Sequence, residues 1–289
     1  MKHIKYMPVI LITFLLWGSS FIIFKVALRT LPPVTLLLCR YLVAVPVLFA
    51  LLFVRGKLRP LARKDAGTIF TIGFMGFFFS FCLQMYAVER LTGSLSSLLG
   101  VLNPVFIPVL AAVFLKERIT PAMVACICVS MTGVVVIVGV GGTAEPAGVL
   151  LMLASVFLWS GTSIIMRRIA GRYDPMQVVM MALICAIPFV GAWSAVELRT
   201  AQASFPLSTV LAVVYLATLG MAVPHSLWNY CLSRMDVSFC SMFYPLQPLS
   251  SATLGVLLLG EQITPSYVAG AAIICCGIVG TVVSGRNRA

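Results

Sequence analysis

Apolar residues fill ten long stretches of the chain, and short polar or proline-rich breaks separate them. A helix needs about 20 apolar residues to cross the roughly 30 Å hydrocarbon layer of a bilayer. No break is long enough to form an extramembrane domain. The pattern predicts an all-α integral membrane protein with ten transmembrane helices, at residues 7–28, 34–54, 66–88, 95–115, 121–139, 147–169, 175–197, 207–231, 237–259 and 265–284.

Lysine and arginine lie mainly in alternate breaks. If the N-terminus is cytoplasmic, 15 of the 20 basic residues fall on the cytoplasmic side and 3 on the outer side. Cytoplasmic loops of membrane proteins carry this excess of positive charge. The asymmetry predicts a multi-pass protein of the cytoplasmic (inner) membrane with both termini in the cytoplasm. The remaining two cations, Lys25 and Arg40, lie within predicted spans.

The composition excludes several classes of protein. The chain is 61% hydrophobic and 10% charged, whereas soluble domains carry about 25% charged residues. The net charge of +12 does not indicate nucleic-acid binding, because the basic residues flank apolar segments. The nine cysteines lie inside apolar stretches, and only His3 and His225 could supply imidazole. We therefore expect no metal site, disulfide framework or cofactor.

The two halves of the chain resemble each other. Trp17 matches Trp159 at an offset of 142 residues, and Pro104 matches Pro248 at an offset of 144. Residues 115–121 also match residues 259–265, and in both blocks a glutamate precedes Ile-Thr-Pro, where we expect the threonine to cap the next helix. We predict two five-helix repeats, residues 1–143 and 144–289, in one membrane domain. Because five is odd, the second repeat is inverted, as in many secondary transporters.

Several short motifs, in this order, resemble the EamA branch of the drug/metabolite transporter superfamily: residues 16–21 (LWGSSF), Pro32-Pro33, Arg40-Tyr41, residues 115–118 (LKER) and residues 258–261 (LLGE). The resemblance covers nearly the whole chain. It implies ten helices, cytoplasmic termini and export of amino acids or related metabolites. Many relatives carry Glu-Pro in the ninth span, where this chain has Gln247-Pro248. That departure puts any mechanism using this carboxylate in question.

Two pairs of residues occupy equivalent faces of the first and sixth spans, Trp17 with Ser20 and Trp159 with Thr162. Tryptophan prefers the membrane interface, so an indole at mid-depth needs a buried partner or a wet cavity. Either the pairs line a substrate cavity symmetrically, or they pack helices together with the hydroxyls as hydrogen-bond donors. We favour packing for the hydroxyls and leave both interpretations open for the tryptophans.

Proline interrupts the fourth and ninth spans near their centres, with an amide side chain beside each interruption. Such helix breaks free backbone carbonyls, which a polar side chain or a substrate must satisfy. Broken helices at equivalent positions of two repeats indicate a transport site, although a self-satisfied kink is the alternative. The residues concerned are Asn103, Pro104 and Pro108 in the fourth span and Pro245, Gln247 and Pro248 in the ninth.

Four further candidates lie in the third and eighth spans: Gln84, His225, Trp228 and Asn229. His225 is also the only group in the spans that ordinarily titrates near neutral pH, so it is a candidate for proton coupling. Lys25 and Arg40 are candidates for contact with a substrate carboxylate, since all eight acidic residues lie in loops or at span ends. A structural role for Arg40 is the alternative.

These residues favour a secondary transporter that exports amino acids or similar metabolites by alternating access. The alternatives are a broad-specificity drug or metabolite carrier working in either direction, and a flippase for lipids or lipid precursors. A membrane enzyme is not expected, because the spans hold neither a nucleophile with its base nor a metal cluster. The expected partners are a small-molecule substrate and the bilayer, without nucleic acid. The sequence leaves open the substrate, the direction, proton coupling, the resting conformation, and the choice between monomer and homodimer.

Overall fold

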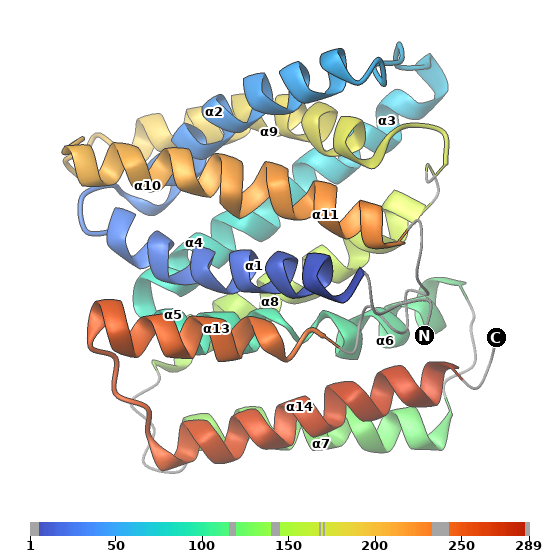
Figure 1. Cartoon of the computed structure of the whole chain (residues 1–289), viewed down its shortest axis with the longest axis vertical. Helices are drawn as coiled ribbons and strands as arrows, with labels where there is room; N and C mark the ends of the chain where they lie inside the picture. The colour runs from blue at the N-terminus through green and yellow to red at the C-terminus, as the bar shows by residue number, and fades with distance from the viewer. Residues whose placement is uncertain are drawn as a thin grey trace.

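The computed structural model describes residues 6–115, 120–139, 145–167, 169, 171–232 and 243–286, and these are almost entirely helical (Figure 1). Six helical stretches are long and apolar enough to cross a membrane: Met7–Ala27, Pro33–Val54, Arg63–Arg90, Pro146–Met166, Pro175–Glu197 and Leu207–His225. Four shorter apolar helices accompany them, Gly93–Ile107, Pro121–Ile137, Leu246–Leu259 and Pro265–Gly280. These helices coincide with the ten apolar stretches of the sequence, as expected for a multi-pass membrane protein.

The helices of the first half are α1 (Met7–Ala27), α2 (Pro33–Val54), α3 (Arg63–Thr71), η2 (Ile72–Ser80), α4 (Phe81–Arg90), α5 (Gly93–Gly100), α6 (Asn103–Leu115) and α7 (Pro121–Gly139). Those of the second half are α8 (Pro146–Arg167), α9 (Pro175–Glu197), α10 (Leu207–Ala217), η3 (Thr218–Ala222), α11 (Val223–Leu232), α13 (Leu246–Leu254), η4 (Gly255–Leu259) and α14 (Pro265–Arg286). The ninth predicted span starts at residue 237, but residues 233–242 lie outside the described ranges.

Local sequence explains where several helices begin. Proline is the first residue of α2, α7, α8, α9 and α14, a position at which its missing N–H costs nothing. Thr120 accepts a hydrogen bond from the N–H of Met123 (3.2 Å), and Thr264 accepts one from Tyr267 (3.1 Å). The predicted threonine caps are therefore confirmed at both corners.

Wide π-helical turns occur at matching places in the two halves. The segments η2 and η3 interrupt the third and eighth apolar stretches, and a shift of 144 residues superposes their sequence positions. An inserted π-turn changes the helix face presented on either side and often lies next to a functional site. Here the turns come just before Phe81 and His225, which both border the central region described below.

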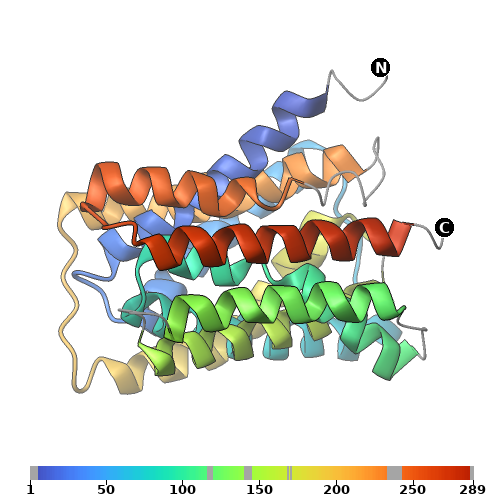
Figure 2. The ribbon, with the colours of Figure 1, turned by 90° about the horizontal axis from the view of Figure 1, so that it is seen from below.

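Close packing joins α7 and α14 along one edge of the bundle (Figures 1 and 2). A Cβ atom added at Gly277 would lie 2.7 Å from the carbonyl oxygen of Cys126, and one added at Gly133 would lie 2.8 Å from that of Gly270. The two contacts are equivalent under the repeat, because Gly277 is the counterpart of Gly133 and Gly270 that of Cys126, each at an offset of 144 residues. Small residues let helix backbones approach in a membrane, where apolar surface alone gives no preference for helix over lipid.

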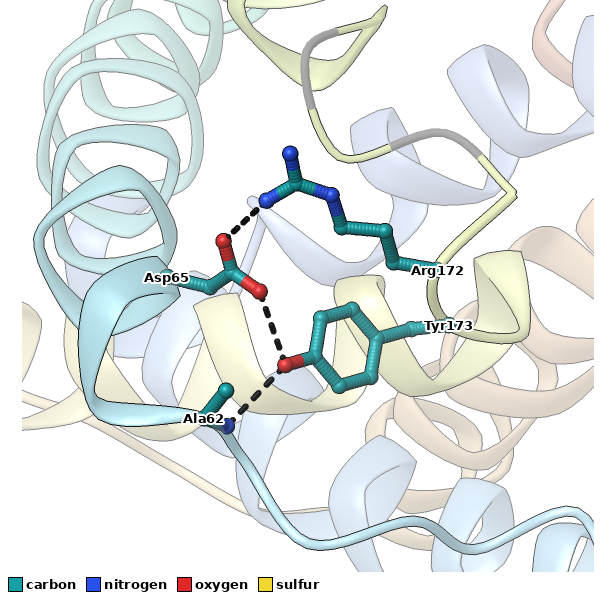
Figure 3. A network of polar contacts seen from close by, with 4 residues as sticks. All are labelled: Ala62, Asp65, Arg172 and Tyr173. Carbon is teal, nitrogen blue, oxygen red and sulfur yellow. Dashed lines mark hydrogen bonds and ion pairs between the residues drawn. The ribbon is translucent and has the colours of Figure 1, made fainter.

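The opposite edge is formed by α2 and α9, which contact each other along their length. At one end, Asp65 accepts hydrogen bonds from Arg172 Nη1 (2.5 Å) and Tyr173 OH (3.0 Å) (Figure 3). The Tyr173 hydroxyl also accepts from the N–H of Ala62 (3.0 Å). We call these four residues the Asp65 clamp; it ties the start of α3 to the turn before α9.

The other end of the same helix pair has a second carboxylate. Glu197, the last residue of α9, accepts hydrogen bonds from the N–H groups of Val34 (3.2 Å) and Thr35 (2.9 Å). These donors belong to the first turn of α2 and have no intrahelical acceptor, so a carboxylate there completes the helix end. The Tyr86 hydroxyl donates to Glu197 as well (3.2 Å). Both ends of the α2–α9 pair are thus held by buried or partly buried polar contacts.

Candidate substrate cavity

A cavity of about 330 Å³ lies between the halves of the bundle. Its lining comes from α1, α2, η2, α4, α5 and α6 of the first half and from α8, α9, η3, α11 and α13 of the second. Nine residues predicted from the sequence line it: Trp17, Ser20, Arg40, Gln84, Asn103, Trp159, His225, Trp228 and Gln247. The structure therefore brings together most of the candidate residues, which come from seven separate apolar stretches.

Arg40 is the charged group of this cavity. Its side chain is 4% exposed, and Nε and Nη1 have no hydrogen-bond partner among the residues that the structure describes. The guanidinium carbon lies 5.1 Å from the ring centre of Phe24 and 5.7 Å from that of Phe81. Aromatic faces attract a cation but leave its N–H groups unsatisfied. A buried charge in this state is costly, so Arg40 is poised to bind an anionic ligand.

The lining as described contains no aspartate or glutamate. A cationic ligand would therefore meet the field of Arg40 without a countercharge from these side chains. Coulomb energies are large where water is excluded. The electrostatics of the described lining favour ligands that carry a carboxylate or another anionic group.

Aromatic rings form one wall around Trp17. Its ring centre lies 5.5 Å from Phe14 and 5.8 Å from Trp228, which in turn lies 6.0 Å from Tyr244. Trp159, the repeat counterpart of Trp17, also lines the cavity. Each tryptophan therefore belongs to its own aromatic cluster, and both also border the cavity.

Trp159 contacts the third apolar stretch through two edge-on rings. Its ring centre lies 5.3 Å from that of Phe77 and 5.3 Å from that of Phe81. Such geometries contribute about 0.5–1.5 kcal/mol beyond simple burial. The indoles of Trp17 and Trp159 thus serve both of the roles that the sequence left open, as packing residues and as cavity walls.

The two amides beside the helix breaks differ. Asn103 accepts a hydrogen bond from Ser160 Oγ (3.0 Å) and donates one to the carbonyl of Gly100 (3.1 Å), where α5 ends. Gln247 is 7% exposed, and its side chain makes no hydrogen bond to the described part of the chain. Asn103 therefore mainly satisfies the broken backbone, whereas the amide of Gln247 is available to a ligand.

His225 borders the cavity from the first turn of α11. Its Nδ1 lies 2.7 Å from the carbonyl oxygen of Met221, one turn earlier in the chain. The ring stands edge-on to Trp17, with 5.5 Å between ring centres. These two contacts hold the imidazole in one orientation.

Two predicted site residues lie outside the cavity lining, and the side chain of a third is not described. Lys25 donates to the carbonyls of Val88 (3.1 Å) and Glu89 (2.9 Å), in a separate pocket of about 450 Å³. The Thr162 hydroxyl donates to Leu158 within its own helix (2.9 Å), which agrees with the packing interpretation. The side chain of Asn229 lies outside the described residues.

Of the prolines predicted to break helices, Pro104, Pro245 and Pro248 are not part of the lining. Pro104 is the second residue of α6, directly after the gap between α5 and α6. Pro245 precedes α13, and Pro248 lies in its first turn, where a missing N–H is tolerated. Pro108 lies inside α6, and its side chain is outside the described part.

Sequence reasoning missed several aromatic residues of the lining, including Phe24, Phe81 and Tyr244. The repeat offset contained a signal for two of them. Phe81 is the counterpart of His225 at 144 residues, and Tyr244 is the counterpart of Gly100, which also lines the cavity. Applying the repeat to every candidate would have found Phe81, whereas Gly100 was not itself a candidate.

Comparison with known proteins gives a family. The model of the EamA-like transporter family matches residues 4–139 and again residues 146–283. The chain is 29% identical over 294 residues to a probable amino-acid metabolite efflux pump of Salmonella typhimurium, covering 96% of this chain and 95% of that one. It is 30% identical over 284 residues to a protein of the same description from Escherichia coli, covering 93% and 91%.

Two further similarities extend this picture. A probable terminal-alkyne amino-acid exporter of Streptantibioticus cattleyicolor is 28% identical over 292 residues, with 99% of this chain and 95% of that one covered. A solved crystal structure aligns with a TM-score of 0.67 and 23% sequence identity over 98% of both chains. At that identity the likeness concerns the fold alone.

Proposed function

The chain belongs to the EamA-like transporter family, and from this premise we propose that it exports amino acids or closely related metabolites across the cytoplasmic membrane by alternating access. It is a multi-pass membrane transporter of the EamA type. The proposal concerns its substrate, its direction and the way in which its two halves move. The names of the relatives from Salmonella typhimurium and Streptantibioticus cattleyicolor favour amino acids.

The observation that carries the proposal is the state of Arg40. This guanidinium is buried, borders the cavity and has two nitrogen atoms without a described partner. A planar guanidinium matches a carboxylate with two parallel hydrogen bonds. Every amino acid supplies that group, so Arg40 is the proposed anchor for the substrate carboxylate.

The size and walls of the cavity support the same class of substrate. A volume of about 330 Å³ lies at the lower end of the range for small-molecule sites, about 300–1,000 Å³. An amino acid fits this space more readily than a drug-sized molecule or a phospholipid. The aromatic walls around Trp17 and Trp159 suit an apolar side chain.

The matching of the two halves supports alternating access through inverted repeats with boundaries near residues 1–143 and 144–289. The family model matches each half separately. Contacts also recur in pairs: α1 packs on α13 as α8 packs on α6, and α4 packs on α8 as α11 packs on α1. A pseudo-symmetric unit can exchange the conformations of its halves, which opens the cavity first to one side and then to the other.

Proteoliposome transport is the direct test. Purified protein would be reconstituted and offered the common L-amino acids, a nucleotide, a quaternary ammonium cation and a fluorescent phospholipid. We expect saturable counterflow of at least one amino acid and no movement of the cation or the phospholipid. Transport of the cation or the lipid without any amino acid would replace the proposal with a drug carrier or a flippase.

Topology has an independent test. Single cysteines would be introduced near each chain end in a variant without reactive native cysteines, and then labelled from either side of inside-out vesicles. Ten spans require both ends to react from the same side, and the distribution of basic residues predicts that this side is the cytoplasmic one. Labelling from opposite sides would exclude two inverted five-helix repeats.

A further inference from the structure

We infer that His225 is the residue that selects substrates bearing an amino group, with its Nε2 atom accepting a hydrogen bond from the amine of a substrate whose carboxylate lies on Arg40. This inference rests on the proposed function and specifies it. It names the residue that distinguishes an amino acid from the 2-oxo acid with the same carboxylate and side chain.

The hydrogen bond to Met221 determines the tautomer of His225. Nδ1 lies 2.7 Å from the Met221 carbonyl oxygen, and a carbonyl oxygen can only accept. The proton of the neutral ring must therefore be on Nδ1. Nε2 then carries a lone pair and acts as an acceptor.

The surroundings of the ring place this acceptor at the cavity. His225 belongs to the lining, while its Nδ1 side faces the backbone of its own helix. The edge-on contact with Trp17 prevents the ring from turning freely. The guanidinium of Arg40 lines the same cavity of about 330 Å³. A donor and an acceptor that border one small cavity suit the carboxylate and the amine, which share one carbon atom in an amino acid.

Other hydrogen-bonding groups of the lining differ from His225. The Asn103 amide oxygen already accepts from Ser160. The hydroxyls of Ser20 and Ser163 donate within their own helices, which leaves their oxygens as acceptors too. The amides of Gln84 and Gln247 can turn to present either a donor or an acceptor. His225 combines an acceptor determined by its own contact with a ring whose orientation Trp17 restricts.

The consequence is a preference that can be measured. An ammonium group donates a hydrogen bond to the Nε2 lone pair. The carbonyl oxygen of a 2-oxo acid has no proton to donate, so its lone pairs and that of Nε2 repel each other. Sites built around a hydrogen bond reject analogues that cannot make it by large factors. We expect the wild-type protein to prefer an amino acid over its 2-oxo acid by about tenfold or more.

The experiment uses matched probe pairs in counterflow with reconstituted full-length protein. The pairs are L-alanine with pyruvate, L-leucine with 4-methyl-2-oxopentanoate, and L-phenylalanine with phenylpyruvate. Each pair keeps the carboxylate and the side chain and changes only the group at the second carbon. The variants are His225→Leu, which removes the acceptor, and His225→Gln, which supplies an amide able to donate or accept. Thr132→Ala, on an exposed face of α7, is the control.

We expect His225→Leu to reduce amino-acid transport about tenfold while leaving 2-oxo acid transport unchanged, so that the preference disappears. His225→Gln should retain amino-acid transport and accept the 2-oxo acids better than wild type. If His225→Leu lowers both members of a pair equally, or leaves their ratio unchanged, the assignment of His225 is wrong while amino-acid transport stands. If the wild-type protein transports none of the three amino acids, the proposed function itself is wrong.

Discussion

Two arginines of this protein have opposite surroundings. Arg172 is half-exposed and donates to Asp65 in the clamp at the end of the α2–α9 pair. Arg40 is almost fully buried, yet two of its nitrogen atoms lack a hydrogen-bond partner in the described parts of the chain. If stability alone determined these surroundings, the buried Arg40 would need a hydrogen-bonded acid partner more than the half-exposed Arg172 does.

The difference separates structural polar groups from groups available to a ligand. In the Asp65 clamp each carboxylate oxygen and the Tyr173 hydroxyl has a named partner. In the cavity, two nitrogen atoms of Arg40 have none among the described residues. The hydroxyls of Ser96 and Ser97 are also buried without a described partner, but they lie outside the lining. Leaving a buried charge without hydrogen bonds costs more than leaving a hydroxyl without them. The unpaired guanidinium at the cavity therefore supports the proposed substrate site.

The largest expected effect comes from removing the guanidinium of Arg40. Arg40→Met should reduce amino-acid transport by about 30-fold or more, since truncating a buried charge partner costs about 2–5 kcal/mol of binding. Thermal stability in detergent should stay the same or rise, because an unpaired buried charge is replaced by an apolar chain. Counterflow and a thermal unfolding scan measure the two effects. A loss of stability without a specific loss of transport would place Arg40 with the structural groups.

The Asp65 clamp should respond in the opposite way. Asp65→Ala leaves the Tyr173 hydroxyl and Arg172 without their acceptor, at a cost of about 1–3 kcal/mol. We expect a lower unfolding temperature and lower yield, with an unchanged ranking of substrates. Arg172→Ala is the matched control, and it should cost less than Asp65→Ala because the Arg172 side chain is half-exposed and Asp65 keeps the Tyr173 hydroxyl as a donor. A changed substrate ranking for Asp65→Ala would show that the Asp65 clamp influences substrate binding and is not purely structural.

The α7–α14 contact offers a third test. Gly277→Ala places a Cβ 2.7 Å from the Cys126 carbonyl oxygen, and overpacking of this kind costs about 1–3 kcal/mol. Gly67→Ala is the control, since nothing lies within 4 Å of a Cβ there. We expect the unfolding temperature to fall for the first variant and to hold or rise for the second. Equal stabilities would show that α7 and α14 can separate without loss.

The smallest effect is expected for Lys25, the other cation of the predicted spans. Its ammonium group holds the last carbonyls of α4 and is not part of the cavity lining. Lys25→Met should cost about 0.3–1 kcal/mol of stability, as expected for a cation at a helix C-terminus. Substrate affinity, measured by competition in counterflow, should change less than about twofold. A loss comparable with that of Arg40→Met would assign the carboxylate contact to Lys25 instead.

Most of the fold follows from regular features of the sequence. Apolar length predicts the helices, because only a helix satisfies its own backbone in lipid. Proline and threonine predict helix starts, as at Pro121 and Pro265 with Thr120 and Thr264 before them. The repeat predicts which residues occupy equivalent places, and nine of the candidates named from the sequence line the cavity.

Only the tertiary structure distinguished residues that looked alike in the chain. Lys25 and Arg40 are both cations within apolar stretches, and Asn103 and Gln247 are both amides beside prolines. Helical spacing places a side chain on a face, but it does not say which backbone carbonyl or hydroxyl from another helix will lie opposite. Val88 and Glu89 supply partners for Lys25, and Ser160 supplies one for Asn103. Arg40 and Gln247 face the cavity without such partners, and that arrangement depends on helices distant in sequence.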